Sequence, residues 1–183
     1  MGRTTTARSV AVVGLDLSLT RSAACYVPPG WEPGDWDSLE FVTAGFEVKG
    51  RDPAACARRL SVVANVMFEF VHWRVQQARS DELHVFLEDH AYGIGQSNIV
   101  TAELVGCVKR DLYERLGIVA LPVNQSTARK LLLGKLPPRE RGSAVAVALK
   151  AAGWPHRGSD VGDAFVVANA GRSDLGMVAV VLA

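Results

Sequence analysis

VAVVGLDLS, residues 10–18, places one carboxylate inside a short apolar run. A short run rich in β-branched residues is typical of a central strand that is buried on both faces. Asp and Glu are rarely buried unless a cation, a hydrogen-bond network or an exposed sheet edge accommodates them. Asp16 is therefore hard to explain as an ordinary structural residue, and it is the first candidate site residue.

Two further strands are predicted at about residues 22–27 and 39–48, on either side of a turn-rich loop at 28–35, PPGWEPGD. With the first strand they make an antiparallel three-strand meander. Asp52 then offers a helix N-cap and Pro53 suits the first helical position, so a helix is predicted from there to about residue 79.

The second half of the chain alternates strands with helices. Strands are predicted at 83–88 and 118–123, with an amphipathic helix between them that Gly117 ends. Helices are predicted at about 125–133, 139–152 and 159–169, and a last one in the apolar tail 173–182. This order predicts an α/β fold, in which the meander and two crossover strands form a mixed five-stranded sheet with helices on both faces.

Composition narrows the class of protein. The 183 residues suit a single domain at 10–183, preceded by a flexible arm at 1–9 that lacks the apolar segment of a secretory signal. No uncharged apolar run is long enough to span a membrane. The three cysteines, Cys25, Cys56 and Cys107, are widely spaced, which favours a reducing, cytoplasmic setting over a zinc site or disulfides. The net charge of +1 is low for a DNA-binding protein.

Three further acids stand at positions where active sites form. Glu88 ends the predicted fourth strand, and strand ends carry the sites of α/β sheets. Asp160 and Asp163 share one helix face with the small residues Ala164 and Ala168, which should pack on the sheet. Taken singly, Asp163 suits a helix first turn, Asp160 an N-cap, and Glu88 an arginine partner. Together with Asp16 they predict a carboxylate site for two Mg²⁺ or Mn²⁺ ions that hydrolyses a phosphodiester.

A cluster of basic residues lies between the predicted fifth strand and the last helices. It contains Arg129, Lys130, Lys135, Arg139 and Arg141. Such cations either hold DNA phosphates near the carboxylates or form an ordinary solvated face, and the pattern leaves both interpretations open.

Several motifs, in order, resemble one known family. GLDLSL at 14–19 followed by AACYV at 23–27 resembles the opening hairpin of RuvC-type Holliday junction resolvases, which have an RNase H-like fold. FVTAGF at 41–46, VFLE at 85–88, AELVG at 102–106 and SDVGDAF at 159–165 are similar to later segments of that family. The resemblance covers about residues 10–171. Leu17-Ser18 in place of the usual Pro-Gly, and a longer loop at 28–37, favour a divergent, phage-like branch.

The resemblance implies a homodimer whose two sites each cut one strand of a four-way DNA junction, as in DNA recombination and repair. It implies two Mg²⁺ or Mn²⁺ ions per site, no nucleotide cofactor and no membrane partner. The residues that it implies for catalysis and metal binding are Asp16, Glu88, Asp160 and Asp163. Those that it implies for DNA binding are Tyr92, which would stack on a base, and Arg129, Lys130, Lys135 and Arg141.

Three alternatives remain open at this point. The same carboxylates would serve an RNase H-like nuclease acting on flaps, replication forks or RNA-containing substrates. A sugar-kinase or actin-like ATP-binding domain also opens with a strand carrying Asp, but it needs a second domain and glycine-rich phosphate loops that this chain does not show. A non-catalytic junction-binding relative is disfavoured by the four intact carboxylates.

Overall fold

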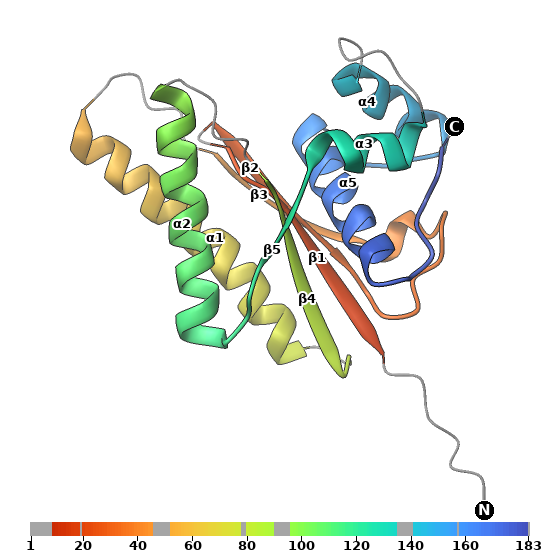
Figure 1. The fold of residues 1–183 in the computed structure, drawn as a ribbon, viewed down its shortest axis with the longest axis horizontal. Coiled ribbons are helices and arrows are strands. Elements are labelled where there is room, and N and C mark those ends of the chain that lie inside the picture. The colour runs from red at the N-terminus through yellow and green to blue at the C-terminus, as the bar shows by residue number, and fades with distance from the viewer. Residues whose placement is uncertain are drawn as a thin grey trace, which may run out of the picture.

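The structure is a computed structural model. It describes residues 9–18, 20–45, 52–77, 80–89, 96–134, 141–156 and 158–182, without the side chains of 96–98 and 141–143. Five strands form one sheet in the order β3-β2-β1-β4-β5 (Figure 1). They are β1 (Val10–Asp16), β2 (Arg21–Val27), β3 (Glu40–Gly45), β4 (Glu82–Glu88) and β5 (Leu121–Val123). The β1–β2 and β2–β3 pairs are antiparallel, whereas β1–β4 and β4–β5 are parallel. The predicted meander with two crossover strands is confirmed.

Helices cover both faces of this sheet, as predicted (Figure 1). One face carries α1 (Pro53–Gln77) and α2 (Gln96–Leu116), and the other carries α3 (Gln125–Leu133), α4 (Arg141–Ala151) and α5 (Ser159–Asp174). Each face has its own buried apolar cluster. The N-cap expected at Asp52 is present, because its carboxylate accepts hydrogen bonds from the backbone N–H groups of Ala54 and Ala55.

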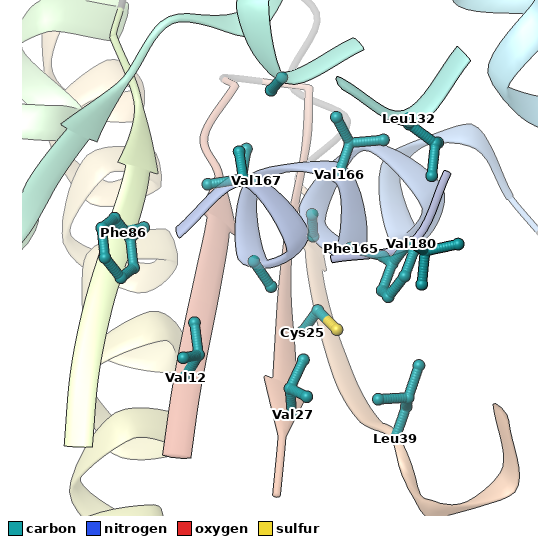
Figure 2. Packing of buried hydrophobic residues seen from close by; sticks show 14 of the residues in the cluster. Val12, Cys25, Val27, Leu39, Phe86, Leu132, Phe165, Val166, Val167 and Val180 are labelled. Atoms are coloured by element: carbon teal, nitrogen blue, oxygen red, sulfur yellow. The ribbon is translucent and has the colours of Figure 1, made fainter. Parts of the chain in front are cut away.

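Helix α5 lies directly on the middle of the sheet (Figure 2). A Cβ atom added at Gly14 of β1 would overlap the backbone of Ala164 and Ala168, and one added at Gly171 would overlap the Phe86 ring. The expectation that the small residues of this helix pack on the sheet is confirmed. This close approach holds the start of α5 beside the end of β1.

The loop between β2 and β3 packs on the same face as α5. Trp31 and Trp36 are buried there, and both rings contact Phe165 of α5. The Trp36 indole Nε1 donates a hydrogen bond of 2.9 Å to the carbonyl oxygen of Ala152, which follows α4. This loop therefore ties the α4–α5 connection to the sheet.

Two elements differ from the sequence prediction. The helix predicted at 173–182 is wrong, because α5 runs on to Asp174 and ends where Gly176 adopts a φ of +72°. Hydrogen bonds from Gly176 N to Ser173 O and from Met177 N to Arg172 O close its last turn. The fifth strand is shorter than predicted, because the N–H of Ile118 bonds back to Leu112 O and the ladder with β4 begins only at Leu121.

Other predicted segments fall partly outside the described residues. Residues 46–48 of the expected third strand do, and so do residues 1–8 of the expected N-terminal arm. Ser9, the last residue of that arm, is anchored, since its backbone N–H and its hydroxyl both bond to the Asp81 carboxylate. Within the described segments, no helix combines the length and the apolarity needed to cross a membrane.

Candidate active site

Two of the candidate carboxylates lie side by side because their strands are parallel neighbours. Asp16 ends β1 and Glu88 ends β4, and the pairing register sets Leu15 beside Leu87, one residue before each acid. The carboxyl ends of parallel strands meet at one edge of a sheet, where α/β folds keep their sites. The backbone thus brings Asp16 and Glu88 to the same edge.

Helix α5 adds the other two carboxylates to this edge. Asp160 and Asp163 lie in its first two turns, immediately before the segment that rests on Gly14. The pKa of Asp16 is raised from 3.8 to about 8, first by burial and then by the charges of Glu88, Asp163 and Asp160 and a hydrogen bond with Glu88. The other three predicted carboxylates therefore lie close enough to Asp16 to disfavour its charged form.

Asp163 differs from Asp16 because it has a cation beside it. The Arg129 guanidinium donates a hydrogen bond of 2.9 Å to Asp163 Oδ1, and both side chains are at least four-fifths buried. Burial raises the pKa of the Asp163 carboxyl, while the charge and hydrogen bond of Arg129 lower it in part. Arg129, predicted from the sequence to contact DNA, therefore pairs with one of the clustered carboxylates in this structure.

Two residues at the site were missed from the sequence. Gln125, the first residue of α3, donates a hydrogen bond of 2.9 Å to Glu88 Oε2. Arg21, the first residue of β2, lies 3.5 Å from Asp160 Oδ2 and is mostly exposed. A usable signal existed for both, because residues that follow β5 or begin β2 must lie at the same sheet edge as the end of β1.

The donor atoms suit a divalent cation, although the side chains are not arranged around one. Four carboxylates are the hard oxygen ligands that Mg²⁺ and Mn²⁺ prefer, and the pKa of Asp16 is raised by burial and by charge repulsion, both of which a cation would offset. Among the described residues, no three His, Cys, Asp or Glu side chains stand in a ligating arrangement. Gln125 and Arg129 each engage one of the carboxylates instead.

The other predicted DNA-binding residues are only partly described. Lys130 is exposed on α3, next to the inward-facing Arg129. Arg141 begins α4, but its side chain lies outside the described residues, as do Tyr92 and Lys135 altogether. Their predicted roles stay predictions.

Comparison with known proteins supports the fold. No protein-family model matches the chain, and no curated protein matches its sequence. Two solved structures of Thermus thermophilus RuvC superpose on 91% of the chain and on 96% and 97% of their own chains. One is RuvC in complex with a Holliday junction substrate (TM-score 0.60, 14% identity) and the other is RuvC (TM-score 0.59, 17% identity).

At such low identity, these matches establish a shared fold and leave the activity to be argued from the site. A ROK hexokinase from T. thermophilus aligns with a TM-score of only 0.35, over 66% of this chain and 37% of that one, which is too low to support an argument. The chain therefore has the α/β, RNase H-like fold of RuvC, as the resemblance of its motifs implied.

Proposed function

We propose that this chain is a divalent-metal-dependent endonuclease that cuts branched DNA, with the four-way junction as its preferred substrate. The observation that carries the proposal is the convergence of Asp16, Glu88, Asp160 and Asp163 at one sheet edge, where burial and the charges of the other three raise the pKa of Asp16 to about 8. A fold does not shelter four mutually repelling carboxylates for stability, and strongly perturbed acids mark functional sites.

Each residue at the site has a role in this proposal. Asp16, Glu88, Asp160 and Asp163 would hold two Mg²⁺ or Mn²⁺ ions. When bound, such a pair activates the attacking water and stabilises the leaving oxygen of an in-line displacement. Arg129 and the exposed Arg21 supply positive charge beside the carboxylates, where the phosphates that flank the cut would lie.

The substrate and the assembly are proposed from the shared fold and the motifs. The shared fold with a RuvC structure that holds a Holliday junction, and the motif resemblance, favour a four-way junction over other nucleic acids. Two symmetric cuts in one junction need two sites, so we propose that the working form is a homodimer. Lys130, Lys135, Arg141 and Tyr92 remain the proposed DNA contacts outside the carboxylate cluster.

A cleavage panel tests this proposal directly. Four-way junctions, flaps, linear duplexes and RNA–DNA hybrids are incubated with the chain in Mg²⁺, in Mn²⁺ and in a chelator. We expect metal-dependent cuts near the branch of the junction. The Asp16→Asn variant should lose at least about a thousandfold in rate, because metal-assisted catalysis supplies several kcal/mol, while still binding junctions in a gel-shift assay.

Each outcome of the panel discriminates among the alternatives. Cleavage of flaps or hybrids in preference to junctions would keep the nuclease and reject the resolvase. Full cleavage by Asp16→Asn would reject the site itself. Junction binding without cleavage by the wild-type chain in either metal would favour a non-catalytic binding protein, and ATP binding by calorimetry would revive the ATP-binding domain.

A further inference from the structure

A pocket of about 510 Å³ opens next to the carboxylate cluster. It lies between α4, the start of α5 and the loop that joins these helices. Asp163 forms part of its wall, so the pocket and the candidate active site are continuous. Sites for small molecules usually measure about 300–1,000 Å³, which makes this pocket large enough for one nucleotide.

One wall of the pocket is aromatic. Trp154 and His156 both line it, with ring centroids 5.0 Å apart. Behind this wall, Trp154 packs on Phe165 with centroids 5.0 Å apart, and His156 packs on Phe41 at 4.4 Å. The rings are therefore held in place before any ligand arrives, which lowers the entropic cost of binding a flat aromatic group.

Apart from Asp163 and Ser159, the remaining lining is apolar with one cation. Val145 and Leu149 of α4 are buried side chains beneath the pocket, and the exposed Lys150 lies on the same helix. Two aromatic rings set at 72° to each other, an apolar floor and a single ammonium group together suit a nucleobase joined to a phosphate. Proteins bind single-stranded nucleic acid by this combination of stacking and cationic contacts.

We propose that this pocket holds one unpaired nucleotide of the strand that is cut, with its base against Trp154 and His156 and its phosphate beside Lys150. The proposal rests on the proposed nuclease function. Because Asp163 belongs to both the site and the pocket, this nucleotide is a near neighbour of the scissile phosphate. Branched DNA suits such a pocket, since bases at a branch cost less to unstack than bases within a duplex.

The neighbouring residues Ala146 and Val147 provide a matched pair of variants. Ala146 lines the pocket and is exposed, so Ala146→Phe fills the space without disturbing the core. Val147 is 68% exposed, is not among the lining residues, and lies on the same helix, so Val147→Phe adds a comparable ring elsewhere. Thermal unfolding of both variants checks that each remains folded.

The measurement is an abasic scan. Fluorescence anisotropy gives the dissociation constant for four-way junctions, in chelator to prevent cleavage, with single abasic sites placed in turn on each side of the branch. In the wild-type chain we expect one position whose loss weakens binding about tenfold, the effect of one stacked base. Ala146→Phe should bind the intact junction about tenfold more weakly and lose this sensitivity, whereas Val147→Phe should behave as the wild type does.

Lys150→Gln supplies a second variant that leaves the volume of the pocket nearly unchanged. It should weaken binding severalfold and reduce the slope of log K against log salt by about one, because one phosphate contact is lost. Free deoxynucleoside monophosphates, added as competitors, test for a separate nucleotide source. Their binding without any position-dependent abasic effect would overturn the proposal that the pocket serves the DNA strand.

The outcomes separate this proposal from the one on which it rests. If the wild-type chain neither binds nor cuts DNA, both fail. A different outcome is that the wild-type chain binds and cuts junctions while Ala146→Phe and Val147→Phe lose the same affinity at each abasic position. In that case only the pocket proposal fails.

Discussion

The polar side chains at the two ends of α5 have opposite surroundings. At its C-terminal end, Asn169 exchanges two hydrogen bonds with the backbone of Val180, at 2.7 and 3.0 Å. Arg172 donates to the carbonyl oxygens of Val178 and Trp31, and its guanidinium lies 4.9 Å from the centroid of the Trp31 ring. At the N-terminal end, Asp160 and Asp163 instead meet two more carboxylates.

This contrast separates a stabilising end of the helix from the end that carries the proposed site. A buried polar group that is fully hydrogen-bonded stabilises a unique packing, whereas clustered like charges cost stability and persist where a ligand or a reaction needs them. The C-terminal end of α5 therefore anchors the chain, and its N-terminal end carries two residues of the proposed active site.

The largest expected effect is at the anchoring end. Arg172→Ala removes a buried side chain and leaves the carbonyl groups of Val178 and Trp31 without their donor, which should lower the free energy of unfolding by about 3–5 kcal/mol. Urea denaturation measures this loss. Arg58→Ala is the control, because Arg58 is 71% exposed. A loss below about 1 kcal/mol for Arg172→Ala would contradict the anchoring role.

Beside the N-terminal end of α5, a substitution of Asp16 in β1 should stabilise the chain when metal is absent. The folded-state pKa of Asp16 is raised from 3.8 to about 8, so the folded chain binds more protons than the unfolded chain between these values and stability falls as pH rises. Asp16→Asn removes this loss. We expect a gain of roughly 2–4 kcal/mol at pH 8 in chelator, shrinking towards zero near pH 4. A gain that does not change with pH would contradict this origin.

The contact at Gly14 connects the two ends. Gly14→Ala places a methyl group against the backbone of α5, so the helix must shift, at a cost of about 1–3 kcal/mol. The same shift moves Asp163 away from Asp16, so cleavage should fall in the fully folded variant. Gly106→Ala is the control, because a Cβ there meets nothing within 4 Å. Unchanged cleavage would show that the site tolerates movement of α5.

The smallest expected effect concerns the counter-charge of Asp163. Arg129 lowers the pKa of this carboxyl, so its stabilising contribution is present where Asp163 is ionised and is lost as pH falls. Arg129→Met should cost about 1 kcal/mol in chelator at neutral pH and less at acid pH. Thermal unfolding at both pH values tests this. An equal cost at both pH values would indicate lost packing rather than lost charge.

Local patterns were sufficient for most of the architecture. The apolar run around Asp16, the Asp52-Pro53 cap and the stripe of small residues on α5 each depend on neighbours a few positions away, and the structure bears out each one. The tail after Asp174 was mistaken for a helix, because its apolar composition does not reveal that its backbone bonds to Leu132 and Asn169.

Partner choice at the site was decided by the tertiary structure. Asp16 was recognisable because a carboxylate inside a β-branched run breaks a local rule, whatever its neighbours are. Which cation meets which acid depends on contacts across 34 residues for Arg129 and Asp163, and across 139 for Arg21 and Asp160. No periodicity extends over such separations. The four acids could be named from the sequence, and the strand order places Arg21 and Gln125 at the same sheet edge. Which acid each of them contacts, and the inward turn of Arg129, required the packing of α3 and α5 on the sheet.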